Sequence, residues 1–322
     1  MKLIVQIPCL NEAENLQRAV ADLPRSIDGI SAIEVLVIDD GSTDGTAEVA
    51  RRCGVDHVVR LRRRRGLARV FLAGLNAAVR CGADVIVNFD ADNQYRGADI
   101  PRLIAPILAG EADMVIGDRE VATLEHFSPS KRVLQQLGSW VVRKVSTTEV
   151  PDATSGFRAF SREAALRMNV VTDFTYTLET IIQAGKQRLA LAHVAVTTNA
   201  QTRPSRLFST TWDYLKRSAV SIIRIYTHYE PLKTFTILGL GFLVPGTLIG
   251  LRFVYDYWLG LGHGKVQSLI LAAVLLIVGV QIILIGLIGD TIAANRHLTE
   301  EILYLQRRAA EREGGRDGRD AR

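Results

Sequence analysis

The fold of this chain is decided by the stretch Val85-Ile86-Val87-Asn88-Phe89-Asp90-Ala91-Asp92-Asn93-Gln94-Tyr95. Its apolar, β-branched first half and acidic second half predict a buried parallel strand that ends in a polar loop. In open α/β sheets the ligand crevice lies beyond the carboxyl ends of the strands, so we expect Asp90 and Asp92 to point into it. Two hard oxygen ligands one residue apart suit Mg²⁺ or Mn²⁺, and such an ion suits a diphosphate. Aspartates after a strand are also ordinary turn formers and helix caps, which is the alternative role for this pair.

Short apolar runs alternate with helical patterns on both sides of this stretch. We expect strands at residues 3–7, 34–38, 57–61, 85–89 and 114–119, and helices beginning near residues 11, 47, 66 and 97. Strands that alternate with helices in this way predict an α/β domain with a mostly parallel, doubly wound sheet.

A second acidic turn follows the expected strand at residues 34–38. It begins with Asp39-Asp40 and runs through Gly41 to Thr46, so both carboxylates should share the sheet edge with the first pair. A carboxylate there can accept hydrogen bonds from a ribose or a base edge. Helix capping by Ser42 or Asp44 is the alternative.

Four adjacent arginines, residues 62–65, follow the third expected strand. Such a run forms either a solvated or anion-facing surface or a direct phosphate contact, and the sequence leaves both open.

Two long stretches without formal charge lie in the C-terminal third, at residues 234–251 and 268–288. Each approaches the roughly 20 residues that cross a bilayer, so we expect two transmembrane helices rather than buried core helices. Lys and Arg flank both stretches on the side of the two chain ends, which predicts that the termini and the α/β domain are cytoplasmic. Residues 1–5 show no signal-peptide pattern.

Overall composition favours a membrane partner over nucleic acid. The net charge is +5, but the basic residues are not interleaved with aromatic ones in a nucleic-acid-binding pattern. The three cysteines, Cys9, Cys53 and Cys81, have no metal-ligand spacing, and we expect them to be reduced.

Four segments result from these patterns. We expect residues 1–208 to form the α/β domain, 209–231 an interfacial amphipathic helix, 232–290 the two spans, and 291–322 a charged cytoplasmic tail. The stripe Trp212, Leu215, Ala219, Ile222 and Tyr226 supports the amphipathic helix, although a core-packed helix would show it too. The end of the chain after residue 311 is expected to be disordered.

Five motifs follow one another along the chain. They are Pro8-Cys9-Leu10-Asn11-Glu12, Asp39-Asp40-Gly41-Ser42-Thr43-Asp44-Gly45-Thr46, Asp90-Ala91-Asp92-Asn93-Gln94, Gly117-Asp118-Arg119 and Thr154-Ser155-Gly156-Phe157-Arg158-Ala159-Phe160. Together they resemble the motif series of family 2 inverting glycosyltransferases with a GT-A fold. Within that family the chain is most similar to the dolichyl- or polyprenyl-phosphate sugar synthases, over roughly residues 1–208.

The resemblance implies a role for each matching residue. A nucleotide-sugar donor would lie among Pro8, Asn11, Glu12, Asp39, Asp40 and Asp90. A divalent cofactor, Mg²⁺ or Mn²⁺, and the diphosphate would lie at Asp90, Asp92 and Gln94. The acceptor phosphate would be bound by Arg132, Arg158, Arg203 and Arg206, and the catalytic residues would be Asp92, Arg119, Asp152 and Arg158.

This chain departs from the family pattern in two places. After Gly66 it has Leu67-Ala68 where a Lys-Gly pair is common, and it has Arg203-Pro204-Ser205-Arg206 where relatives often carry an Arg/Ser/Lys loop. The second difference makes the phosphate contacts of Arg203 and Arg206 the less secure part of the implied site.

Elementary chemistry agrees with the implied reaction. A divalent cation can neutralise a departing nucleoside diphosphate, and a phosphate monoester acceptor, with a second pKa of about 6, is already mostly dianionic at pH 7. A strong general base is therefore optional, whereas cations that bring two anions together are needed. Asp152 is the candidate base or the residue that orients Arg158, with a simple turn role as the alternative. Glu179 is expected either to face the acceptor or to lie on a helix surface.

The resemblance, together with the two expected spans, thus implies a membrane enzyme that moves a sugar, with inversion, from a nucleotide-diphosphate sugar to a polyprenyl phosphate at the cytoplasmic face. Two alternatives stay open: transfer to a glycan or glycolipid, and a non-enzymatic nucleotide-sugar-binding subunit. A homo-oligomer is compatible with the sequence but not indicated by it.

Overall fold

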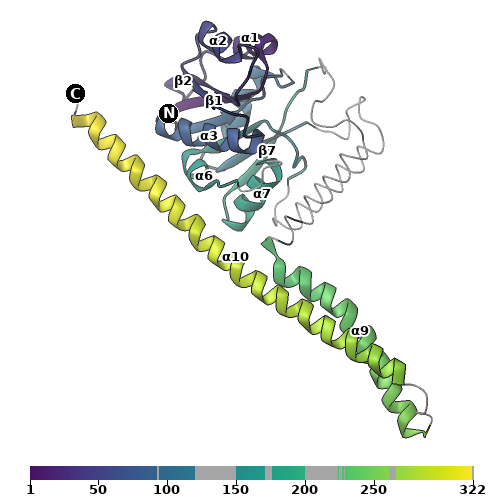
Figure 1. Ribbon diagram of the computed structural model, residues 1–322. Coiled ribbons are helices and arrows are strands. Elements are labelled where there is room, and N and C mark those ends of the chain that lie inside the picture. Colours follow the sequence, from purple (N-terminus) through teal and green to yellow (C-terminus); the bar gives the residue numbers. More distant parts are fainter. Residues whose placement is uncertain are drawn as a thin grey trace. The chain divides into compact units, whose positions relative to one another are not determined.

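A computed structural model describes residues 1–92, 94–119, 150–170, 176–199, 224, 227, 229–260 and 266–320 of the chain, with side chains up to residue 309 except that of residue 297. The chain forms two compact units. The first comprises Met1–Ser221 together with Ile302–Arg322, and the second comprises Ile222–Glu301. Figure 1 shows the elements with their labels.

A seven-stranded sheet forms the centre of the first unit, in the order β3-β2-β1-β4-β6-β5-β7. Its strands are β1 Lys2–Cys9, β2 Ala32–Asp39, β3 His57–Arg60, β4 Val85–Asn88, β5 Met114–Asp118, β6 Arg158–Ser161 and β7 Leu191–Ala195. All neighbours pair in parallel except β6, which runs antiparallel to both β4 and β5. The prediction of a mostly parallel α/β sheet is confirmed.

Strand β6 was not expected from the sequence. It lies between β4 and β5, with Phe160 opposite both Ile86 and Met114. Residues 150–157, directly before it, form neither helix nor strand, and the βα alternation that predicted β1 to β5 does not extend to it. This insertion brings the segment before β6 to the carboxyl ends of β4 and β5.

Helices cover both faces of the sheet (Figure 1). Leu3, Val5 and Ile7 of β1 belong to a buried apolar cluster with Leu16 of α1 and Leu103 of α4. The alternate side chains of a strand face the other side, where α3 packs on β1 and β2 and also contacts α6 and α7. The helices of this unit are α1 Ala13–Ala21, α2 Thr46–Arg52, α3 Leu67–Arg80, η1 Gly97–Asp99, α4 Ile100–Leu108, α6 Arg162–Arg167 and α7 Tyr176–Lys186.

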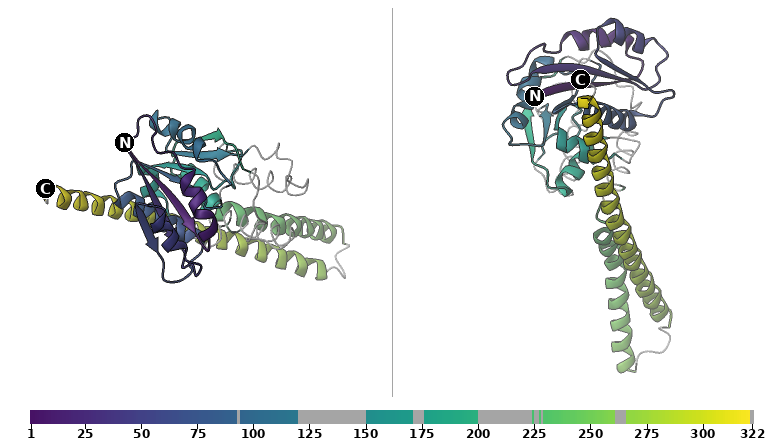
Figure 2. Two further views of the ribbon diagram at one scale, coloured as in Figure 1. Left: turned by 90° about the horizontal axis from the view of Figure 1, so that it is seen from above. Right: turned by 90° about the vertical axis from the view of Figure 1, so that its left-hand side faces the viewer.

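Two long apolar helices, α9 Pro231–Trp258 and α10 Val266–Asp320, follow the sheet domain. They lie side by side within the second unit (Figures 1 and 2). Glycines allow the close approach: a Cβ at Gly239 would lie 2.8 Å from the carbonyl oxygen of Gly279, and one at Gly289 would lie 2.9 Å from Cβ of Pro231. Small residues at such contacts are typical of helix pairs in membranes.

Both helices are long and apolar enough to cross a membrane. The most apolar stretches of Pro231–Trp258 and Val266–Ala309 have mean hydropathies of 1.9 and 3.0. Their surfaces carry many exposed large apolar side chains, and the aromatic residues Tyr255, Tyr257 and Trp258 are exposed at the end of α9. The predicted spans at residues 234–251 and 268–288 fall inside these helices. The expected interfacial helix at residues 209–231 lies mostly outside the described residues.

The C-terminal tail differs from its prediction. Helix α10 continues to Asp320, so the expectation of disorder after residue 311 is wrong for residues 311–320. Within the first unit, the Tyr304 hydroxyl donates to Glu163 at 2.8 Å, and Arg307 donates to the carbonyl oxygens of Leu166 and Met168 at 3.1 and 2.8 Å. The end of α10 therefore satisfies carbonyl groups at the C-terminus of α6, which a helix otherwise leaves without partners.

Candidate active site

Sheet topology gathers the two acidic turns at one edge. Strands β2, β1 and β4 are parallel neighbours, so their carboxyl ends place Asp39 and Asp40 beside the turn that follows β1, and Asp90 and Asp92 on its other side. Pro8 lies buried near the end of β1. Its missing N–H costs no ladder bond, because the pairing of β1 with β4 ends at Gln6.

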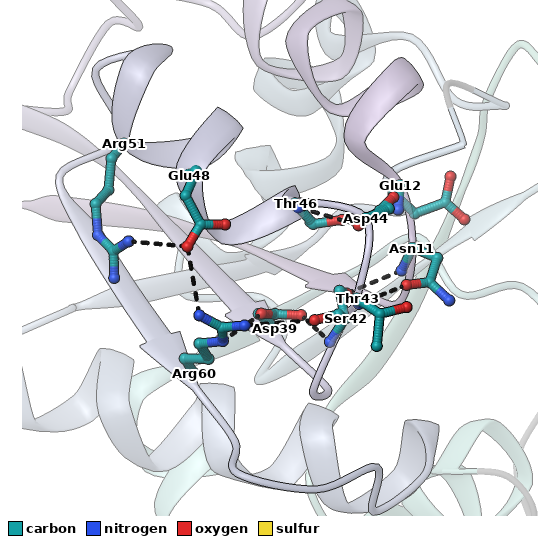
Figure 3. Close-up of polar contacts among 10 residues, drawn as sticks. All are labelled: Asn11, Glu12, Asp39, Ser42, Thr43, Asp44, Thr46, Glu48, Arg51 and Arg60. Atoms are coloured by element: carbon teal, nitrogen blue, oxygen red, sulfur yellow. Dashed lines mark hydrogen bonds and ion pairs between the residues drawn. The ribbon is translucent and has the colours of Figure 1, made fainter.

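Side chains and backbone amides join the first two turns of this edge (Figure 3). Asn11 has the left-handed φ of 54°, its N–H donates to Ser42 Oγ at 2.9 Å, and its Oδ1 accepts from the Thr43 N–H at 3.0 Å. The N–H groups of Glu12 and Ala13 donate to Thr46 Oγ1 and Asp44 Oδ2, each at 3.0 Å. The turn after β1 and the turn after β2 are thus one hydrogen-bonded unit, with Asn11 exposed on it.

The two aspartates at the end of β2 are buried, and their carboxylates accept hydrogen bonds from backbone amides. Asp39 Oδ1 accepts from the Ser42 N–H at 2.9 Å, and its Oδ2 lies 3.4 Å from Arg60 Nε. The carboxylate of Asp40 accepts from the N–H groups of Arg65 and Gly66 at 2.6 and 2.9 Å. In addition to any ligand contact, this pair therefore shapes the turn. The N-cap residue of α2 is Gly45, which makes no side-chain cap hydrogen bond, so the alternative of capping by Ser42 is wrong, and Asp44 Oδ1 accepts from the Thr46 N–H at 3.0 Å.

A buried polar network supports the other acidic turn. Asn88, the polar residue of β4, donates to the carbonyl oxygen of Gly156 at 2.9 Å and to the Tyr176 hydroxyl at 3.0 Å, and accepts from Gln6 at 2.9 Å. The Tyr95 hydroxyl accepts from the Gly156 N–H at 3.3 Å. The sequence analysis did not single out Asn88 or Tyr95. The available signal was Asn88 itself, since an amide side chain in an otherwise apolar strand indicates a buried polar network.

Gly156 lets this loop approach Asp90. A Cβ at Gly156 would lie 2.8 Å from Asp90 Oδ2 and 3.0 Å from the Tyr176 hydroxyl. Any larger residue would displace the carboxylate. The network therefore fixes both the loop before β6 and the position of Asp90.

Asp90 is the electrostatically unusual member of the site. Burial, and next the negative charge of Asp92, raise the pKa of Asp90 to about 7, although Arg119 and Arg158 act in the opposite direction. Asp90 is half-buried, and a carboxylate pushed toward its protonated form by a second carboxylate is relieved by a cation, so the donor set fits a divalent metal. Gln94 lies beside the pair, with its N–H donating to Asp92 Oδ1 at 3.1 Å. Among the described residues no group of three or more His, Cys, Asp or Glu is arranged around a metal position.

Arg119 is held by Asp152, not left mobile at the end of β5. Its Nε donates to Asp152 Oδ2 at 2.7 Å, and its Nη2 donates to Asp152 Oδ1 at 3.1 Å and to Thr154 Oγ1 at 2.8 Å. Burial alone would raise the pKa of Asp152, but the charge and hydrogen bonds of Arg119 outweigh it and hold that pKa below its usual value. A carboxylate so stabilised in its ionised form is a poor proton acceptor, and it orients Arg119 where we expected it to orient Arg158.

Arg158 lies beneath the site. It has no exposed surface, and its guanidinium donates to the carbonyl oxygens of Ser155, Thr177 and Ala153 at 2.7, 2.7 and 2.9 Å and to Thr180 Oγ1 at 2.6 Å. Burial lowers the pKa of Arg158 to about 10. With its donors committed in this way the guanidinium does not line the acceptor side, contrary to the role that the resemblance implied.

The remaining predicted residues have varied positions. Glu12 is 8% exposed and accepts from Asn15 Nδ2 at 3.0 Å. Glu179 is buried in α7, so the expectation of a helix-surface glutamate is wrong. Arg132, Arg203 and Arg206 lie outside the described residues, as does Asn93 of the central motif.

Sheet order, acidic edge and helical layers define a GT-A-like α/β domain. The chain belongs to glycosyl transferase family 2, whose model matches residues 4–167. It is 31% identical over 176 residues to the polyprenol monophosphomannose synthase of Mycolicibacterium smegmatis, covering 52% of this chain and 65% of the relative. It is 32% identical over 166 residues to the undecaprenyl-phosphate mannosyltransferase of Micrococcus luteus, covering 50% and 66%. The chain thus spans just under two thirds of the length of these relatives.

A solved structure supports the fold. The glucosyl-3-phosphoglycerate synthase of Mycobacterium tuberculosis, in complex with Mn²⁺, UDP and glucosyl-3-phosphoglycerate, superposes with a TM-score of 0.54. The match covers 70% of this chain and 78% of that one at 23% identity.

Proposed function

We propose that this chain transfers a sugar, with inversion, from a nucleotide-diphosphate sugar to a polyprenyl phosphate at the cytoplasmic face of a membrane. The observation that carries the proposal is the juxtaposition of an acidic pair, Asp90 and Asp92, with an arginine fixed by its own carboxylate, Arg119 on Asp152. The names of the two mannosyl-transferring relatives support this acceptor class.

The donor nucleotide is proposed to lie over the joined turns after β1 and β2. Asn11 is exposed there, whereas Asp39 and Asp40 contribute mainly by holding the turns that present backbone groups. Pro8 and Glu12 belong to the same turn after β1. The donor diphosphate then extends toward Asp90 and Asp92 at the end of β4.

A divalent cation, Mg²⁺ or Mn²⁺, would be held by Asp90 and Asp92 with Gln94 nearby. When bound, it supplies Lewis-acid neutralisation of the charge that develops on the departing diphosphate. Asp92 and the buried environment keep Asp90 partly protonated without a cation, so the two carboxylates are arranged for a charge that they do not themselves balance.

The acceptor side is proposed to use Arg119. Its side chain is 17% exposed, and hydrogen bonds to Asp152 and Thr154 fix the orientation of its guanidinium. An arginine held in this way can orient a phosphate without reorganising during the reaction. Arg132, Arg203 and Arg206 remain proposed partners of that phosphate.

The bond changes need no protein base. A dianionic phosphate oxygen of the acceptor forms the new bond to the anomeric carbon, while the bond from that carbon to the donor phosphate oxygen breaks with its electron pair. Attack from the opposite face inverts the anomeric centre. Asp152, stabilised as the anion by Arg119, contributes by positioning that arginine.

The membrane arrangement is proposed from α9 and α10. Two spans with basic residues on the side of the chain ends would place both termini and the catalytic domain in the cytoplasm. A protease-accessible tag at each terminus, with a reporter near residue 262 on the opposite side, is the expected result.

The function is tested by supplying the full-length protein with Mg²⁺ or Mn²⁺, a polyprenyl phosphate and a panel of labelled nucleotide sugars. Label from one or a few donors should enter the organic phase as a mild-acid-labile sugar monophosphate lipid, and unphosphorylated polyprenol should not replace the acceptor. Label transferred to an unphosphorylated glycan or glycolipid would contradict the acceptor assignment. Donor binding without transfer to any acceptor would contradict the enzymatic role.

A further inference from the structure

The loop between β3 and α3 displays a strong positive charge that the proposed reaction does not use. Arg62, Arg63, Arg64 and Arg65 are consecutive and all exposed. We call these four residues the arginine loop. Within the described part of the chain, none of the four guanidinium groups makes a hydrogen bond or an ion pair.

The backbone of the arginine loop is held by hydrogen bonds and close contacts with residues 39–41, at the end of β2. The two carboxylate oxygens of Asp40 accept hydrogen bonds from the N–H groups of Arg65 and of Gly66, the residue after the loop. On the other side of the loop, the Leu61 N–H donates to the Asp39 carbonyl oxygen at 2.8 Å. A Cβ at Gly41 would lie 3.1 Å from Arg63 C and Arg64 N, so the loop packs flat against the turn after β2. The side chains are therefore presented to solvent from a fixed support.

Nearby carboxylates are already occupied by a different arginine. Arg60 lies 3.4 Å from Asp39 Oδ2 and 3.3 Å from Glu48 Oε1, and Glu48 also pairs with Arg51 at 3.8 Å. Asp39 and Glu48 thus neutralise Arg60 and Arg51, and the carboxylate of Asp40 accepts backbone amides instead of pairing with a guanidinium. The charge of the arginine loop is left for a ligand outside the protein.

The four arginines are consecutive, and this arrangement favours a surface of many phosphate groups over a single phosphate group. Consecutive side chains diverge from the backbone, so one phosphate group can be reached by only one or two of them. A plane of phosphate groups can engage all of them, and guanidinium groups bind phosphate with a well-matched geometry. Each basic residue near an anionic bilayer surface adds favourable energy, without any need for a shaped pocket.

We propose that the arginine loop is a binding surface for the phosphate headgroups of an anionic lipid bilayer. The bilayer is at hand because the same chain carries α9 and α10, which are long and apolar enough to cross it. The contact would hold the donor-side turns, through Asp40, against the headgroup layer. This inference does not depend on which sugar, or whether any sugar, is transferred.

The test is arginine footprinting of full-length protein in nanodiscs. Phenylglyoxal, an uncharged arginine reagent, is applied in discs of neutral phosphatidylcholine and in discs that contain about 30% phosphatidylglycerol. Modification of the arginine loop should be slowed about threefold or more in the anionic discs, and about 0.5 M NaCl should restore it by screening. The exposed arginines Arg18, Arg25, Arg52 and Arg80 should react equally in both discs and serve as the internal control.

A matched pair of variants separates the loop from net charge. One replaces all four loop arginines with glutamine, and the other carries R18Q, R25Q, R52Q and R80Q. Anionic lipid should slow amide hydrogen exchange across residues 61–70 in the wild type and in the second variant, but not in the first. Loss of the effect in both variants would overturn the proposal, because net charge would then explain it.

Two further outcomes would also overturn it. One is equal reactivity of the arginine loop in neutral and anionic discs. The other is protection in neutral discs by a nucleoside diphosphate with Mg²⁺, with no effect of phosphatidylglycerol, which would assign the loop to the donor phosphates. None of these measurements uses sugar transfer, so failure of the proposed enzymatic function would leave the result interpretable.

Discussion

The two ends of the sheet edge use charged side chains in opposite ways. Around β2 and β3, the arginines lie at the surface: the buried carboxylate of Asp40 accepts two backbone amides of the loop after β3, and the four arginines of that loop face solvent. Around β4, β5 and β6, the arginines are bound by other protein groups: Arg158 has no exposed surface, and the guanidinium of Arg119 donates to the carboxylate of Asp152. The same residue type therefore serves as a surface cation at one end and as an internal brace at the other.

Burial explains this difference in role. A buried arginine must donate its hydrogen bonds to protein oxygens, because an unpaired charge away from water lowers the free energy of unfolding. An exposed arginine keeps its hydration and remains available to an anion. Removal of a charge should thus be felt throughout the fold at the β4–β6 end and only locally at the β2–β3 end.

The largest effect is expected for Arg158→Met. The change leaves the carbonyl oxygens of Ser155, Thr177 and Ala153 without their donor, so the free energy of unfolding should fall by about 3–5 kcal/mol. Chemical unfolding of the full-length protein in detergent measures it. Arg80→Met, at an exposed position, is the control and should change stability by less than about 0.5 kcal/mol. Equal midpoints for the two variants would remove the distinction between the two ends.

The acidic pair should separate activity from stability. Asp92→Asn keeps the shape and removes one charge, so sugar transfer should fall about a hundredfold or more while the domain stays folded. Exposed Asp28→Asn should retain activity. Transfer that survived both the Asp92 change and complete chelation would show that the acidic stretch is only a turn.

Asp90 should also give the metal-free protein a distinctive pH dependence. Its folded pKa of about 7 lies above the ordinary value of about 3.9, so the folded state keeps a proton that the unfolded state loses between these values. The contribution of Asp90 therefore makes stability fall as pH rises from about 4 to about 7, and Asp90→Asn should abolish this contribution. Thermal unfolding across pH measures it, and added Mn²⁺ should stabilise the wild type more at pH 8 than at pH 5. An unchanged pH slope in Asp90→Asn would show that the carboxylate is not enclosed as described.

Asp152→Asn tests positioning against base catalysis. Loss of the ion pair frees Arg119, and a misplaced cation should lower kcat about 10- to 100-fold without changing the pH profile. Thr154→Val, which removes one hydrogen bond to Arg119 and no charge, should shift kcat in the same direction by less. If Asp152→Asn abolished turnover with intact substrate binding, Asp152 would be the base.

The smallest effect is expected at the other end, for Asp40→Asn. An amide oxygen can still accept one backbone N–H, so the cost should be about 1 kcal/mol, with faster hydrogen exchange confined to residues 61–66. Exchange that increased throughout the sheet would show that this turn is as integral to the fold as the β6 region.

Much of the fold and half of the candidate site were predictable from the sequence. Alternating apolar runs and helical patterns predicted β1 to β5, and the polar residues after each strand predicted a shared edge with Asp39, Asp40, Asp90 and Asp92. These predictions succeed because strand and helix periodicity are local, and because parallel strands carry their last residues to one side of the sheet. The absence of charge over two long stretches likewise predicted α9 and α10.

Only the tertiary structure decided which arginines are internal. Arg158 and the arginines at residues 62–65 cannot be told apart by residue type, since Arg158 begins one short strand and the other four follow another. Their environments differ because β6 enters antiparallel between β4 and β5, about 70 residues from β4 in the chain, and buries Arg158 beneath the loop that it braces. That pairing joins residues far apart in the chain, so the local periodicity of apolar residues that predicts strands and helices does not reveal it. The chain by itself determines where charges gather, whereas burial, which follows from non-local packing, determines which of them remain free to meet a ligand.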